Sequence, residues 1–179
     1  FPSMMPRIDF SDTDNWFNEA IQRGMVIHRT YSYYGADNYL PYIAQMFGKE
    51  KVDLDSNEFQ LFYQWYLSEL LKYLNEKGYR FCYLKYGDEW QADELPAMVK
   101  RLTPIRKIGW KFALNPNDTV YGPPENRRLL KGIVDAFQEC SEMKNLIETV
   151  KEVQKERPLV PPDGLWLVTT SSFWWNQSN

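Results

Sequence analysis

The sequence predicts a mixed α/β (α+β) fold that is rich in helix, with about five or six helices covering a small mixed sheet of about four strands. Two observations support this prediction. The chain has 179 residues, of which 44% are hydrophobic and 25% charged, a composition typical of folded globular proteins. Segments with helical spacing of apolar residues alternate with short runs of β-branched and aromatic residues. Because no repeat or low-complexity segment divides the chain, we expect one globular domain over residues 1–179.

The first part of the chain predicts two short helices with a strand between them. Ser11 or Thr13 can cap the first helix, and Gly24 ends it. Residues 25–34 are rich in β-branched and aromatic side chains, which favours a strand. A second short helix follows this strand and ends at Gly48.

The strongest helical pattern covers residues 55–77. Asp55 or Ser56 can cap this helix, and Gly78 ends it. Apolar side chains cover most of its circumference, which is typical of a central core helix. The alternative is that part of its aromatic face is a docking surface. The residues that cover it are Phe59, Phe62, Tyr63, Trp65, Tyr66, Leu67, Leu70, Leu71, Tyr73 and Leu74.

Three further elements are expected before residue 115. Residues 79–86 carry rings on both faces of a predicted strand, which indicates a strand covered on both sides. Residues 93–102 predict a helix. Residues 105–114 predict a third strand.

The last third of the chain predicts one long helical region and a final strand. From residue 125 to residue 157 apolar residues recur four and three apart, as in a heptad seam. One straight helix of that length would span about 50 Å at ~1.5 Å per residue, whereas a domain of this size is about 40 Å across. The helix therefore either breaks near Ser141, which we favour, or protrudes from the domain. Residues 165–170 predict a strand, and the aromatic cluster at 173–175 is expected to pack back onto the body.

Charge is unevenly distributed along the chain. Residues 1–98 carry 9 basic and 15 acidic side chains, residues 99–131 carry 8 and 2, and residues 132–179 carry 4 and 7. One interpretation is that these segments fold together and neutralise one another. The other is a basic patch that attracts an acidic partner. At least two of Arg127, Arg128 and Lys131 are expected to be exposed and to share such a patch with Lys107 or Lys111. The alternative is that they pair with acids of residues 1–98, such as Asp88 or Glu89.

The sequence contains no recognisable catalytic or metal-binding motif. His28 is the only histidine, and Cys82 and Cys140 lack the spacing of zinc ligands. Glycine-rich phosphate loops are absent. The paired carboxylates, such as Asp53 with Asp55, precede predicted helices and are interpreted as caps. We therefore expect no cofactor and no metal.

These observations favour a non-enzymatic binding protein that acts through protein–protein interaction, as an inhibitor, an immunity-type protein or an adaptor. Its expected partner is another protein with an acidic surface. One alternative is a nucleic-acid-binding protein that uses the basic segment 100–131. A second alternative is an enzyme with His28 as general base. The predicted binding residues are Lys107, Trp110, Lys111, Arg127, Arg128, Lys131, Trp174 and Trp175.

The sequence gives no indication of a membrane or secreted protein. No apolar run reaches the ~18 residues that span a bilayer, and no signal-peptide pattern is visible. Two cysteines are too few for a disulfide framework. We therefore expect a cytoplasmic, intracellular location.

Overall fold

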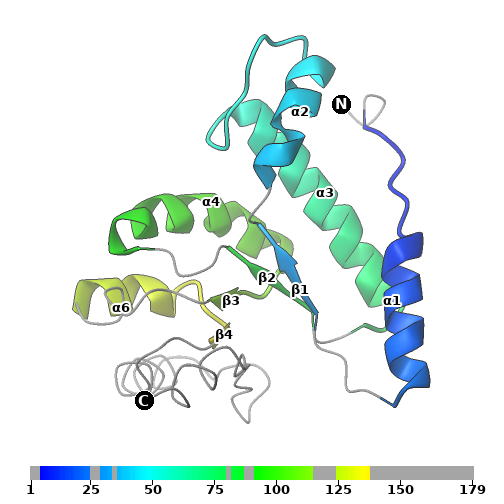
Figure 1. Cartoon of the computed structure of the whole chain (residues 1–179). Coiled ribbons are helices and arrows are strands. Elements are labelled where there is room, and N and C mark those ends of the chain that lie inside the picture. The colour runs from blue at the N-terminus through cyan, green and yellow to red at the C-terminus, as the bar shows by residue number, and fades with distance from the viewer. Residues whose placement is uncertain are drawn as a thin grey trace, which may run out of the picture. The chain divides into compact units, whose positions relative to one another are not determined.

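The computed structural model describes residues 5–24, 29–33, 36–79, 82–86, 91–114 and 124–137, which are drawn in colour in Figure 1. The chain divides into two units. Unit 1 consists of Phe1–Thr30 and Asp37–Cys82, and unit 2 of Tyr31–Ala36 and Tyr83–Asn179. Each unit is described by itself below. The expectation of one domain over residues 1–179 stays a prediction.

The predicted sheet of about four strands is wrong for the residues that the structure describes. Helices make up most of their regular structure, and the strands are two to four residues long. The strands form two pairs: β1 (Arg29–Ser32) with β2 (Cys82–Lys85), and β3 (Ala113–Leu114) with β4 (Ala136–Phe137). A single bridge, between Leu84 and Phe112, links β2 to the residue before β3. The sequence prediction failed because apolar runs that favour strands lie partly in helices.

Unit 1 begins with the short helix α1 (Ser11–Gln22), close to its predicted bounds. A carboxylate oxygen of Asp9 accepts a hydrogen bond from the backbone N–H of Ser11 at 2.9 Å, which satisfies one of the free donors at the helix start. Gly24 follows α1 with φ of 68°, a left-handed conformation that glycine adopts without strain. The segment before α1, residues 5–10, has no regular structure.

The next two helices of unit 1 also agree with the sequence prediction. A short 3₁₀ turn, η2 (Ala36–Tyr39), leads into α2 (Leu40–Met46). The long helix α3 (Asn57–Glu76) starts after Ser56, whose hydroxyl oxygen accepts a hydrogen bond from the N–H of Phe59 at 3.4 Å. Six side chains of α3 are buried in the core: Phe59, Phe62, Tyr63, Leu67, Leu70 and Leu74.

The turn before α3 is held by Asp53. Its side chain accepts a hydrogen bond from the N–H of Asp55 at 2.9 Å, and its backbone carbonyl accepts one from the hydroxyl of Ser56 at 2.6 Å. The cap of the helix itself is Ser56. The interpretation of Asp53 and Asp55 as caps therefore stays a prediction.

Helix α1 packs beside the C-terminal end of α3 (Figure 1). The rings of Phe17 and Tyr79 stack with centroids 3.7 Å apart, and Phe10 stacks on Tyr73 at 4.3 Å. The ammonium of Lys77 lies 3.1 Å from a carboxylate oxygen of Asp14. These contacts fix both the helix and the last residue of the segment that precedes it.

In unit 2 the helix α4 (Leu95–Ile108) follows the 3₁₀ turn η3 (Ala92–Glu94). The predicted strand 105–114 is wrong over its first four residues, because α4 runs through Pro104 and ends at Gly109 with φ of 111°. The buried side of α4 keeps a regular spacing of three and four residues. It consists of Leu95, Met98, Leu102 and Ile105. Only Ala113 and Leu114 of the predicted strand form β3.

The predicted long helix from residue 125 is also wrong within the described range. Helix α6 (Pro124–Lys131) ends before Gly132, and β4 pairs in parallel with β3 only a few residues later. The break therefore comes about ten residues before the expected one. Leu129, which starts the heptad pattern, is 42% exposed. The predicted break at Ser141, the strand 165–170 and the aromatic cluster 173–175 lie outside the described residues.

Candidate functional site

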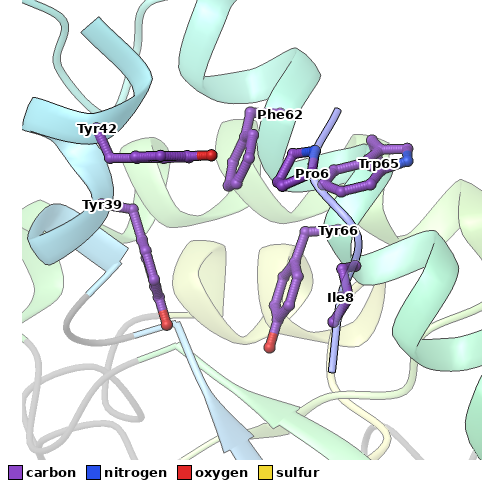
Figure 2. A pocket seen from close by; sticks show the side chains of 7 residues that line it. All are labelled: Pro6, Ile8, Tyr39, Tyr42, Phe62, Trp65 and Tyr66. Carbon is purple, nitrogen blue, oxygen red and sulfur yellow. The ribbon is translucent and has the colours of Figure 1, made fainter. Parts of the chain in front are cut away.

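An apolar hollow on unit 1, here called the aromatic pocket, is the most distinctive surface feature of the described residues (Figure 2). Its volume is about 310 Å³. None of its seven lining side chains carries a charge, and five of them are aromatic. They are Pro6 and Ile8 from the segment before α1, Tyr39 from η2, Tyr42 from α2, and Phe62, Trp65 and Tyr66 from α3.

The rings of the pocket differ in their exposure. Phe62 is buried, with 6% of its surface exposed, while Tyr39 and Tyr42 are each 48% exposed. Tyr42 meets Phe62 edge to face with centroids 6.3 Å apart, and Phe62 meets Trp65 at 5.6 Å. The pocket therefore has a packed aromatic base and an open rim of tyrosine rings.

Two tyrosine rings stand on different sides of the pocket. Figure 2 shows Tyr39 and Tyr66 facing each other across it, with their hydroxyl groups directed toward the same end. The surface that lines the pocket itself is apolar. A molecule bound between these rings would make apolar contacts with the ring faces.

The segment before α1 forms one wall of the pocket and runs along α3. Pro6 lies near Phe62 and Trp65, Ile8 near Tyr66, and Phe10 on Tyr73. Extended chain from residue 6 to residue 10 covers about 13 Å, and the helix from residue 62 to residue 73 rises about 16 Å. The two lengths agree, so the segment follows α3 in an extended conformation and in the same direction.

A polar cluster holds the far end of this segment in place. The Asp14 carboxylate accepts hydrogen bonds from the ammonium of Lys77 and, at 3.4 Å, from the hydroxyl of Tyr79. The hydroxyl of Tyr73 lies beside the same carboxylate without a well-formed hydrogen bond. The pKa of Asp14 is lowered by the neighbouring Tyr73 hydroxyl first and by Lys77 second. Burial is the main cause of the raised pKa of Tyr73 and of Tyr79.

A second hollow of about 380 Å³ adjoins the aromatic pocket on the other side of the same segment. It shares Pro6, Ile8 and Trp65 with the aromatic pocket and adds two exposed charged side chains, Arg7 and Glu69. Met5 and Phe10 of the segment also line only the second hollow, and the charged side chains border that hollow alone.

The predicted binding residues of the basic segment lie in unit 2. Lys107 and Arg128 are exposed, and neither forms an ion pair with a residue that the structure describes. Lys111 is half-buried. Trp110 is 2% exposed, so its ring lies in the interior, as does that of Phe112. The side chains of Arg127 and Lys131, and the whole of Trp174 and Trp175, lie outside the described part.

One basic side chain of this segment is neutralised inside unit 2. Arg106 Nη1 lies 2.8 Å from Asp135 Oδ2, and the same nitrogen donates a hydrogen bond to the carbonyl oxygen of Ile133. Asp135 is 4% exposed and also accepts a hydrogen bond from the N–H of Phe112 at 2.9 Å. Asp135 belongs to the acidic segment 132–179, and Arg106 to the basic segment. For Arg106, this pair agrees with the interpretation that the segments neutralise one another.

The described residues contain no cluster of three or more His, Cys, Asp and Glu side chains that could hold a metal ion. Cys82 is buried, and its thiol donates a hydrogen bond to the carbonyl oxygen of Tyr79 at 3.8 Å. His28, Cys140, Asp88 and Glu89 lie outside the part of the chain that the structure describes.

Comparison of the chain with protein-family models, with curated proteins and with solved structures finds no match. The helices in the described ranges include none with the length and apolar character needed to cross a bilayer. The aromatic pocket and the exposed basic residues of unit 2 are therefore interpreted from their own chemistry.

Sequence reasoning found only part of the aromatic pocket. The alternative interpretation of residues 55–77, an aromatic face that docks a partner, concerns the helix that supplies Phe62, Trp65 and Tyr66. The contributions of Pro6, Ile8 and the tyrosines of η2 and α2 were missed. Their only signal was the density of tyrosine in residues 31–42, which hold five of the twelve tyrosines, and that signal does not show which side chains meet.

Proposed function

We propose that this protein is a non-enzymatic binding protein that acts through protein–protein contact, with the aromatic pocket as a contact site. The observation that carries the proposal is the presence of two tyrosines, Tyr39 and Tyr42, that are each 48% exposed beside a packed aromatic base. Tyrosine and tryptophan are enriched in the energetically dominant centres of protein interfaces. Exposed rings that line a hollow therefore support a docking role.

The lining of the pocket favours a protein side chain over a small metabolite. Pockets for small ligands combine an apolar lining with a few convergent polar or charged groups that fix the orientation of the ligand. Here the lining has no charged side chain, and the surface that it offers is apolar. Such a surface suits an apolar side chain carried by a peptide backbone.

The exposed basic residues of unit 2 support a second contact. Lys107 and Arg128 are exposed and without an ion pair in the described ranges. An acidic surface on a partner protein would complement them and would speed its association. The proposed partner is accordingly a protein with an acidic surface at this contact.

The test compares four forms of the full chain as immobilised bait in native extract. They are the unaltered chain, the pocket variant Tyr39→Ser/Tyr42→Ser, the charge variant Lys107→Glu/Arg128→Glu, and a control, Trp16→Ser. Trp16 is 41% exposed on α1 and lines neither hollow. Mass spectrometry identifies the retained proteins, and each candidate is then purified and titrated against the same four forms.

The expected result is a purified partner whose affinity falls about tenfold or more with the pocket variant and is unchanged with the control. A partner that also contacts the exposed basic residues of unit 2 binds the charge variant more weakly than the unaltered chain. Raising the salt concentration likewise weakens its binding to the unaltered chain. If every retained protein binds the pocket variant as tightly as the unaltered chain, the proposal that the pocket is a contact site is wrong.

A further inference from the structure

We infer that the aromatic pocket binds an extended segment of a partner that contains proline next to lysine or arginine. This inference rests on the proposed function, because it names the occupant of the same pocket. It is drawn from the way in which the chain's own residues Pro6 and Arg7 already use this surface.

Pro6 shows what the aromatic surface accepts. Figure 2 places its ring among the aromatic side chains of the pocket, near Phe62 and Trp65. A proline ring is rigid and apolar, so packing it against an aromatic ring costs little conformational entropy. Aromatic-lined grooves bind proline-containing segments for this reason. The open part of the pocket, bordered by Tyr39, Tyr42 and Tyr66, offers the same kind of surface to a second proline.

Charge on the elements that build the pocket favours a basic neighbour for the proline. Glu69 follows Trp65 by one helical turn on α3, and Asp37 precedes Tyr39 by two residues on η2, and both are exposed. Arg7, next to Pro6 in the chain, already lines the second hollow together with Glu69. Over the whole of unit 1, 11 acidic side chains exceed 8 basic ones.

A second copy of the chain is a poorer occupant. A stable interface between two proteins buries about 800 Å² on each partner. The aromatic pocket has seven lining side chains and a volume of about 310 Å³, which suffices for one or two inserted rings. Its surface is much smaller than that of such an interface. A short peptide needs no larger surface than this one.

The test measures fluorescence anisotropy of labelled nonapeptides titrated with the full chain. The probe repeats Lys-Pro-Pro three times. One control peptide repeats Lys-Ala-Ala, which keeps the charge and removes the proline, and the other repeats Glu-Pro-Pro, which keeps the proline and reverses the charge. We expect the Lys-Pro-Pro peptide to bind about tenfold or more tightly than either control.

Variants then locate the binding site. Tyr42→Ser and, separately, Tyr39→Ser are each expected to weaken binding of the Lys-Pro-Pro peptide about tenfold, whereas Trp16→Ser leaves it unchanged. Because each tyrosine is nearly half exposed, at least one of the two variants keeps the fold, as checked by its circular dichroism and Tm. The double substitution Asp37→Asn/Glu69→Gln is expected to reduce the preference for the basic peptide over the acidic one.

Three outcomes overturn the inference. The first is equal affinity for the Lys-Pro-Pro and Lys-Ala-Ala peptides, which would mean attraction by charge alone. The second is binding that both tyrosine variants leave intact. The third is self-association in sedimentation velocity that Tyr42→Ser abolishes, which would place a second copy in the pocket. If the pocket variants lose a protein partner although no peptide binds, the inference fails and the proposed function stands.

Discussion

Arg106 and Asp135 form a two-pronged ion pair inside unit 2, with Nη1 2.8 Å from Oδ2 and Nη2 3.2 Å from Oδ1. The Asp135 side chain is 5% exposed and that of Arg106 is 29% exposed. The same carboxylate accepts the N–H of Phe112, and the N–H of Asp135 donates to the carbonyl of Phe112. This pair therefore joins α4, the residue before β3 and the residue before β4.

Replacing Asp135 by alanine should lower the free energy of unfolding by about 3 kcal/mol, since it leaves a partly buried guanidinium and a backbone donor without their acceptor. Urea titration followed by circular dichroism measures the change. Arg23→Ala serves as the control, because its ion pair with Glu19 is exposed on both sides and should contribute almost nothing. Equal midpoints for Asp135→Ala and the unaltered chain would contradict the expectation.

Acidification should weaken the attachment of α1 to α3 through Asp14. Because the pKa of Asp14 is lowered in the folded state, its contribution to stability is present above the unfolded value of about 3.9. That contribution is lost as the pH falls through the lower, folded pKa. Thermal melts between pH 7 and pH 3 should therefore show a smaller decrease of Tm for Asp14→Asn than for the unaltered chain. Asp12→Asn, at an exposed neighbouring position, should follow the unaltered chain.

Two adjacent aromatic residues of α1 should respond very differently to truncation. Phe17 is 1% exposed and stacks on Tyr79, so Phe17→Ala should cost about 3–5 kcal/mol of folding free energy. Trp16→Ala removes a larger ring from a position that is 41% exposed and should cost much less. Chemical denaturation of the two variants tests the order, and a larger loss for Trp16→Ala would show that the packing of α1 is different.

Substitution by alanine should affect stability differently at two glycines that follow helices. Gly78 ends α3 with φ of 76°, and a side chain there is strained by about 1–2 kcal/mol although nothing obstructs it. At Gly132 an added Cβ would meet only the carbonyl of Leu129 at 3.7 Å, an ordinary contact. The Tm should therefore decrease for Gly78→Ala and stay nearly constant for Gly132→Ala.

The helices of unit 1 could be predicted because their ends are determined by neighbouring residues. Ser56 accepts the N–H of Phe59, and glycines 24, 48 and 78 all have positive φ after the helices that they end. Such signals lie within a few residues of one another. The pattern of apolar side chains on α3 is also local, so its central place in the core could be inferred.

The predictions failed where local preference and tertiary packing disagree. Residues 105–108 have the composition of a strand, yet Ile105 continues the buried side of α4 because the helix passes through Pro104. The heptad pattern from Leu129 stops at Gly132, since the next residues pair with β3. The aromatic pocket combines segments 20 to 60 residues apart, and without aligned relatives their proximity has no sequence signal.

The parallel pairing of Ala113 with Ala136 implies an order of events during folding. The chain between them must turn back through α6 before the first of these backbone bonds can form, and closing such a loop costs entropy that no local contact repays. The backbone hydrogen bonds of α6 join residues that are close in sequence, and bonds of this kind form and break within microseconds. We therefore expect β4 to join last when unit 2 folds and to separate first when it unfolds.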